Sequence, residues 1–197
     1  MGRAFTEFEK ENIKEELLIE GRHAFEQMHF NAVKVETIAK TVGISKGAFY
    51  TFFDSKEAFF LEILMRFEAD IQSQILNGKE QSESIKDYLI YSIVTLIEAM
   101  ADNFLFISFS DAKVQQSLLA KATELQRERM LNADLALLSE LIPDEKLLTV
   151  SRDEAVDLMR SLFFLLPMKS EIRTPFDQFL RTYTTLIIGG IFKDTEA

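Results

Sequence analysis

Apolar residues recur along almost the whole chain at intervals of three and four positions, the spacing that gathers side chains on one face of an α-helix. The first run predicts a helix of about five turns, and Thr6 with Glu9 matches a capping box at its start. A second run, 35–42, predicts a short helix that Gly43 can end by taking a left-handed conformation. Ser45 can then cap a third short helix that runs to about residue 52.

The helical spacing continues to the C-terminus. A fourth helix, capped by Asp54 or Ser55, is expected to run to about residue 78. Further helices are predicted over 85–101, 118–141, 151–168 and 175–192. The phenylalanines of 103–110 alternate, which allows a strand, although a short buried helix fits the surroundings better. The predicted class is therefore all-α, with three helices over 1–54 followed by a helical bundle over 55–197.

Composition narrows the chemistry. Among 197 residues, 47% are apolar, enough for a sizeable core, and the absence of cysteine excludes disulfides and thiolate metal sites. The N-terminus shows no apolar leader, and no run of about 18 apolar residues predicts a membrane span. We expect a cytoplasmic protein without a cofactor or a resident metal.

Charge is unevenly distributed along the chain. The net charge is −10, but residues 1–56 hold 8 Lys and Arg against 9 Asp and Glu, so most of the acidity lies beyond them. Between Val33 and Lys56, four lysines face only Glu36 and Asp54. A local positive field can therefore bind nucleic acid even though the whole chain is acidic.

Three short helices with a glycine turn between the second and the third are the layout of a helix-turn-helix. Ile44, Phe49 and Phe53 are expected to point inward, which leaves small and polar residues of the third helix free to enter a major groove. Lysines suit phosphates or guanine edges, and the hydroxyl of Tyr50 suits a phosphate. The predicted DNA-binding residues are Lys34, Thr37, Ser45, Lys46, Gly47, Ala48, Tyr50, Thr51 and Lys56.

The stretch IAKTVGISKGAFYTFFDSKEAFF, Ile38 to Phe60, resembles the signature of the TetR family of bacterial transcriptional regulators. The chain departs from the pattern at Thr51 and Phe52, where the family often has His or Tyr, and at Lys34, where it often has Thr. The resemblance implies a helix-turn-helix DNA-binding domain over 1–54 and a helical ligand-binding and dimerisation domain over 55–197. It also implies a homodimeric repressor that binds a palindromic operator in double-stranded DNA and is released by a small effector. The alternative is that the lysines and the tyrosine simply solvate a helical surface.

The body is rich in phenylalanine. An aromatic-lined interior would suit a hydrophobic or aromatic effector, although phenylalanines at helical spacing are more often plain core. The predicted pocket residues are Leu64, Phe67, Ile71, Tyr88, Tyr91, Phe104, Phe106, Phe109, Phe163 and Phe164. The resemblance implies that the last two helices pair with their copies. The predicted dimer residues are Leu158, Leu162, Leu166, Phe179, Tyr183, Ile187 and Gly190.

Two other classes of function are weighed against a regulator. Glu20-x-x-His23 and Glu26-x-x-His29 match the ligand spacing of di-iron bundles, but their positions on one helix point about 240° apart and cannot share a metal. An enzyme is therefore not expected. The nearer alternative is a helical dimer of the same fold with a filled interior and a scaffold or interaction role.

Overall fold

The structure is a computed structural model that describes residues 6–79, 82–124, 126–128, 138–139, 141–142 and 144–193. The described residues form helices, turns and one isolated antiparallel bridge, between Leu148 and Phe192, so the predicted all-α class is confirmed. Packing divides the chain into two compact units: Met1–Glu68 with Asn103–Arg127, and Ala69–Asp102 with Glu128–Ala197. The division at 54/55 inferred from the sequence stays a prediction.

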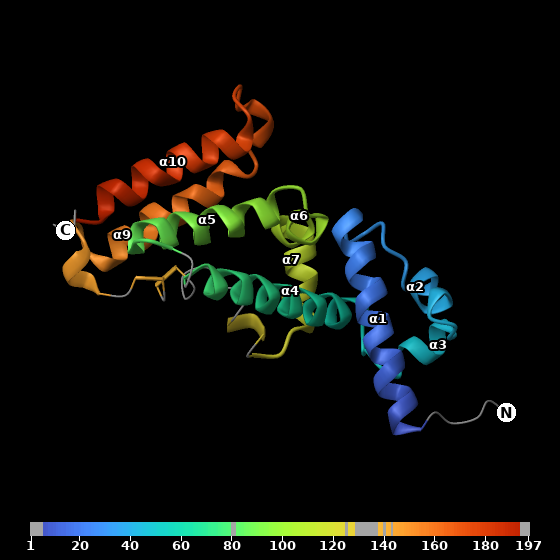
Figure 1. Ribbon diagram of the computed structural model, residues 1–197. Helices are drawn as coiled ribbons and strands as arrows, with labels where there is room; N and C mark the ends of the chain where they lie inside the picture. The colour runs from blue at the N-terminus through green and yellow to red at the C-terminus, as the bar shows by residue number, and fades with distance from the viewer. Residues whose placement is uncertain are drawn as a thin grey trace. The chain divides into compact units, whose positions relative to one another are not determined.

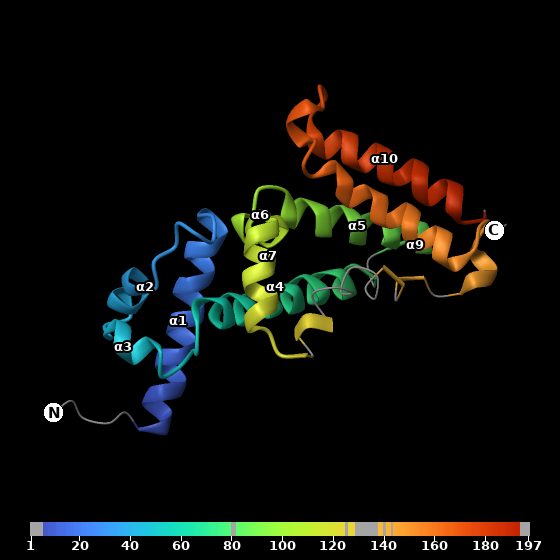
Figure 2. The ribbon, with the colours of Figure 1, turned by 180° about the vertical axis from the view of Figure 1, so that it is seen from behind.

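The first unit surrounds the N-terminal helix, with α2 and α3 on one side of α1 and with α6 and α7 on the other (Figures 1 and 2). We call α1, α2 and α3 the head. The helices of this unit are α1 (Glu7–Gln27), α2 (Val35–Thr41), α3 (Lys46–Phe49), the first part of α4 (Lys56–Lys79), α6 (Phe104–Ser110) and α7 (Ala112–Lys121).

Local hydrogen bonds explain where the first helices begin and end. Thr6 and Glu9 form the predicted capping box at the start of α1. Gly43 has a φ of 80° and supplies the left-handed turn between α2 and α3. The hydroxyl of Ser55 accepts a bond from the amide of Ala58, so Ser55 rather than Asp54 caps α4.

Phenylalanines form the core of the first unit. Phe25, Phe49, Phe59 and Phe60 are completely buried, and their rings meet mostly edge to face or tilted. Gly21 makes room for this cluster, because a Cβ there would lie 2.2 Å from the Cζ of Phe59. The cluster holds α1, α3 and α4 together.

The second unit contains the rest of α4, α5 (Ile85–Ala101), α9 (Arg152–Ser161) and α10 (Phe176–Ile191). Three 3₁₀ turns accompany them: η1 (Glu145–Leu147), η2 (Leu162–Leu165) and η3 (Lys169–Glu171). α10 packs along α5 and buries one face, Leu180, Thr184, Ile188 and Ile191. Within the described ranges, no single helix is both long and apolar enough to cross a membrane.

Two predicted helices are wrong in extent. The single helix predicted over 118–141 is not continuous. Its first residues belong to a shorter helix, α7, which ends at Lys121. Much of the remaining stretch lies outside the described residues. Just after α7, Thr123 and Gln126 form a capping box, in which the backbone amide of each donates to the side chain of the other, and a new helical turn starts. The apolar spacing continues across this break and therefore did not reveal it.

The second helix with a wrong predicted extent is the one over 151–168. The observed helix, α9, ends at Ser161, and the chain continues as the 3₁₀ turn η2. Pro167 explains this ending, since it cannot donate to Phe163 and its ring would clash with that carbonyl in an α-helix. The short helix that we favoured over a strand for residues 103–110 is confirmed as α6.

The turn at Gly43 gives a direct test of the head's backbone. Gly43→Ala should lower the free energy of unfolding by about 1–2 kcal/mol, because an L-residue is strained in the left-handed region. No atom lies within 4 Å of an added Cβ, so the loss would be backbone strain alone. Gly43→Asn is the control and should lose less, since asparagine tolerates this region. Urea unfolding of the full chain measures all three; equal stabilities would contradict the requirement.

Candidate functional site

The exposed side of α3 gathers most of the predicted DNA-binding residues. Phe49 is completely buried and Phe53 nearly so, which turns the opposite side of the helix outward. Ile44, which we expected to point fully inward, is only half-buried. The residues that reach the surface are Ser45, Lys46, Gly47, Tyr50 and Thr51, with Ala48 half-buried among them. Small residues and two longer polar ones therefore share one face.

Hydrogen bonds and one ion pair shape this face. Ser45 accepts a bond from the amide of Ala48 and caps α3, while Thr51 donates its hydroxyl proton to the Ala48 carbonyl. Lys46 lies 3.9 Å from a carboxylate oxygen of Glu36, and both side chains are exposed. An exposed pair of this kind contributes little, so the ammonium of Lys46 can exchange it for a phosphate.

Two predicted residues stand at the start of α2. Lys34 is the N-cap residue and makes no side-chain capping bond, and Thr37 lies in the first turn. Both are exposed, as a contact with the DNA backbone would need.

Lys56 differs from the sequence prediction, because its ammonium points into the protein. It donates to the carbonyl oxygens of Phe30 and Val33, the latter at 2.6 Å, and lies 4.4 Å from the ring centroid of Phe30. Burial lowers the pKa of the Lys56 ammonium, and the nearby carboxylate of Glu57 opposes part of that shift. The predicted phosphate contact of Lys56 is not what this geometry favours.

The predicted pocket residues fall in both compact units and differ in burial. Leu64, Phe67, Ile71 and Tyr88 are buried, and Phe106, Phe109 and Phe163 are half-buried. An interior position is wrong for the other three, Tyr91, Phe104 and Phe164, which are exposed; Phe164 is 66% exposed. Helical spacing identified the apolar positions but could not tell an inner face from an outer one.

The predicted dimer residues lie on α9, η2 and α10 with mixed exposure. Leu162 is completely buried within its own chain, so its place in an interface is wrong. Leu158 and Gly190 are exposed, while Leu166, Phe179, Tyr183 and Ile187 are half-buried. The sequence reasoning missed Leu186, which is 69% exposed on α10 and stands among small residues at helical spacing.

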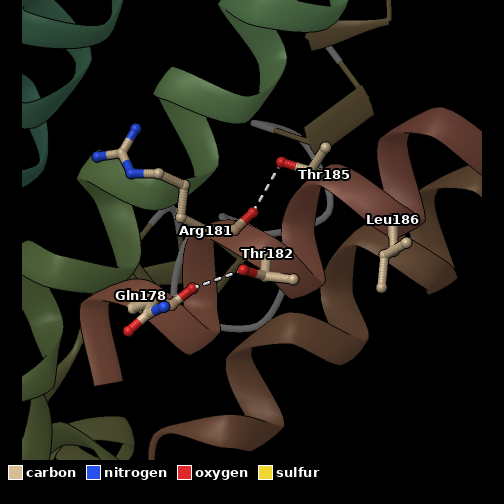
Figure 3. Close-up of a pocket in the computed structure, with 5 residues that line it drawn as sticks. All are labelled: Gln178, Arg181, Thr182, Thr185 and Leu186. Carbon is tan, nitrogen blue, oxygen red and sulfur yellow. Dashed lines mark hydrogen bonds between the residues drawn. The ribbon is translucent and has the colours of Figure 1, made fainter. Parts of the chain in front are cut away.

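A shallow pocket of about 310 Å³ lies on this side of α10, lined by Gln178, Arg181, Thr182, Thr185 and Leu186 (Figure 3). Thr182 and Thr185 donate their hydroxyl protons to carbonyls one turn earlier in α10. These hydroxyls are thus satisfied by their own helix, and the pocket presents polar side chains beside one exposed leucine.

The head and its exposed third helix define a helix-turn-helix DNA-binding protein. Residues 14–63 match the model of the bacterial regulatory proteins of the tetR family. The HTH-type transcriptional regulator YuxN of Bacillus subtilis (strain 168) is 38% identical over 96 residues, which are 48% of this chain and 33% of YuxN. The chain thus aligns with about a third of that relative. The HTH-type transcriptional repressor DhaR of Mycobacterium sp. (strain GP1) is 26% identical over 93% of this chain and 94% of its own.

Solved structures share the fold over nearly the whole chain. A TetR-family transcriptional regulator from Cytophaga hutchinsonii superposes with a TM-score of 0.68 at 14% identity, over 98% of this chain and 100% of its own. FadR from Bacillus subtilis, in complex with stearoyl-CoA, has a TM-score of 0.63 at 13% identity, over 90% of this chain and 98% of its own. RolR in complex with resorcinol has a TM-score of 0.59 at 14% identity, over 93% of this chain and 91% of its own. The tetR family match therefore covers the N-terminal helix-turn-helix region, residues 14–63, and the fold of nearly the whole chain is that of solved TetR-family regulators.

Ser45 allows the cap of α3 to be separated from the charge of its face. Ser45→Ala should lower the free energy of unfolding by about 1 kcal/mol through loss of the cap. Ser45→Asp and Ser45→Asn should both keep the cap. The aspartate variant alone should repel a phosphate, by about 1 kcal/mol at about 4 Å in water, and bind duplex DNA several-fold more weakly than the asparagine variant. Thermal unfolding and a DNA titration measure the two effects; equal binding by both capped variants would remove residue 45 from the interface.

Proposed function

We propose that this chain is a ligand-responsive, homodimeric transcriptional repressor that binds a palindromic operator in double-stranded DNA and leaves it when a small apolar or aromatic effector binds. The observation that carries the proposal is the outer face of α3, where Lys46 and Tyr50 stand beside Gly47 and Ala48 over a buried Phe49. Small side chains let the helix approach base edges, and the longer ones reach phosphates.

Charge supports specific rather than indiscriminate binding. Residues beyond Lys56 carry most of the net charge of −10, whereas the segment from Val33 to Lys56 holds four lysines against Glu36 and Asp54. Fields of exposed charges fade over about 8 Å at physiological salt. The acidic remainder of the chain therefore leaves the contact at α3 intact and disfavours loose association elsewhere.

Exposed apolar residues on α9, η2, the turn after it, and α10 support a dimer. Leu158, Phe164, Met168 and Leu186 are all exposed. Gly189 and Gly190 lie inside α10, where each costs about 1 kcal/mol relative to alanine. Yet a Cβ at either position would meet nothing within 4 Å among the described residues. If a second chain packs closely against α10, residues without a side chain are needed there, which would explain both glycines. Two heads about 34–36 Å apart, or a multiple, would then read the two halves of a palindrome.

An effector has support from the second unit and from relatives. The buried oxygen of Thr184, on the face of α10 that packs along α5, has no hydrogen-bond partner among the described residues. Buried polar atoms ordinarily have partners, and a ligand group could supply this one. FadR was solved with stearoyl-CoA and RolR with resorcinol, so comparable folds hold an acyl compound and a phenol. Useful switching needs a coupling of about 1–3 kcal/mol.

The proposal includes no enzymatic activity and no cofactor, and it places the protein in the cytoplasm, where an operator is accessible. The second candidate function is a dimer of the same fold that lacks an effector. The completely buried core residues of α5, Leu89, Ile93 and Ile97, favour it, because a filled interior would leave no room for a ligand.

The first experiment is a titration with duplex DNA from just upstream of this protein's own gene, repeated over a range of salt concentrations. Lys46→Ala should weaken binding to every sequence and lower the slope of log affinity against log salt by about one. Lys113→Ala on α7, on the other side of α1 from α3 (Figure 1), is the matched control and should keep the wild-type slope.

Tight, salt-dependent binding at two chains or a multiple per site would support the regulator. Wild-type binding no stronger than to unrelated duplexes would count against this operator. A Lys46→Ala variant with an unchanged slope would remove that lysine from the interface.

Substitution at Gly190 tests the dimer. The single chain has open space there, so Gly190→Leu should fold normally. Overpacking between two closely approaching helices should raise the dimer dissociation constant by about tenfold or more. Gly190→Ala is the graded control with a smaller effect. Analytical ultracentrifugation measures both, and a leucine variant that dimerises like the wild type would refute an interface at this face.

A further inference from the structure

The loop between α1 and α2, residues 28–34, is held by side chains from two other helices of the first unit. The amide of Phe30 donates to the hydroxyl oxygen of Ser108 on α6 at 2.7 Å, and both groups are buried. The carbonyl oxygens of Phe30 and Val33 accept from the ammonium of Lys56 at the start of α4. Both backbone polar groups of Phe30 are thus satisfied by side chains distant in sequence.

Packing and further polar contacts reinforce this arrangement. The ring of Phe30 stacks on Phe25 and meets Phe60 edge to face at 5.3 Å between centroids. Next to it, His29 lies 3.5 Å from a carboxylate oxygen of Asp111, the residue that caps α7. Ser117 of α7 donates its hydroxyl proton to Glu57 of α4. α6 and α7 are therefore tied both to the loop and to the helix that holds it.

We propose that Lys56 and Ser108 are positioning residues of the DNA-binding head, which hold the α1–α2 loop between α4 and α6 and so set the orientation of α2 and α3 toward DNA. The inference rests on the proposed function, because it concerns how the regulator presents its recognition helix. It also replaces the phosphate contact predicted for Lys56 with a structural role, in which Lys56 acts on DNA binding through the α1–α2 loop.

The geometry gives the reason for the effect. Val35 begins α2 only five positions after Phe30, and α2 packs against α3 through its buried residues Ile38 and Ala39. A displacement of the loop is therefore carried into α2 and then into α3. Buried amides and carbonyls must keep partners, so the loop cannot move without α6 and α4 or without losing these bonds.

Hydrogen exchange of the full chain without DNA tests the positioning itself. Ser108→Ala removes the acceptor of the Phe30 amide, which should exchange about tenfold faster, the effect expected for a buried donor left without a partner. The amides of α2 and α3 should also exchange faster. Ser92→Ala is the matched control: Ser92 is equally buried but bonds only to Tyr88 of its own helix, and its loss should leave the head unchanged.

Salt-dependent DNA binding tests the part of Lys56. Lys56→Met keeps an unbranched apolar side chain and removes the ammonium, so affinity should fall about tenfold while the salt slope stays that of the wild type. Lys46→Ala in the same experiment marks the slope change of a true phosphate contact, about one. If Lys56→Met lowers the slope by that amount, Lys56 is a phosphate contact and the proposal is overturned for this residue.

The remaining outcomes are also decisive. Faster exchange confined to Phe30 in the Ser108→Ala variant, with α2 and α3 unchanged, would show that the loop is held but does not position the head. If Lys56→Met does not fold, Ser108→Ala carries the test alone. If the wild type binds no operator, the proposed function fails, yet the exchange measurement still decides whether Ser108 positions the head.

Discussion

The buried position of Phe49 is the constraint on which the DNA-binding face depends. Its ring is completely buried and meets Phe59 edge to face at 5.1 Å, while Phe53 meets the same ring at 4.6 Å. A helix of four residues has too few backbone bonds to fix its own rotation, so this contact with α4 fixes it. With Phe49 buried against α4, the side chains of Lys46 and Tyr50 remain exposed to solvent. The capping bond at Ser45 and the left-handed turn at Gly43 then define where the helix begins.

Two lysines in one short segment have very different surroundings. Lys46 is exposed beside a single exposed carboxylate, where water screens the pair and leaves the ammonium available to a phosphate. Lys56 is half-buried against two carbonyls and an aromatic ring, which take the place of water around its charge. The lowered pKa of Lys56 reflects the burial, although its ammonium still serves as the donor that the loop requires.

Local signals in the sequence predicted the head well, because capping boxes, the turn glycine and the inward phenylalanines act over a few residues. The same reasoning failed where the outcome depends on distant partners. Nothing near Lys56 in the sequence reveals the carbonyls of residues 30 and 33, and nothing near Leu162 or Leu186 reveals which one faces its own chain. Apolar spacing identifies a helix face, but only packing decides whether that face meets core, ligand or partner. The expectation of an operator, an effector and a dimer came from the family resemblance and not from spacing.

The division of the chain into compact units bears on how a signal can reach DNA. Ser108 lies 78 positions from Phe30 in sequence, and Ser117 lies 60 from Glu57, yet each pair is hydrogen-bonded within the first unit. α6 also follows directly on α5, the helix along which α10 packs in the second unit. The chain thus joins α5 directly to α6, whose buried Ser108 is bonded to the α1–α2 loop. A head that completes its core and its loop contacts with α4 and α6 cannot change orientation independently of them, and this dependence is what an effector-controlled repressor needs.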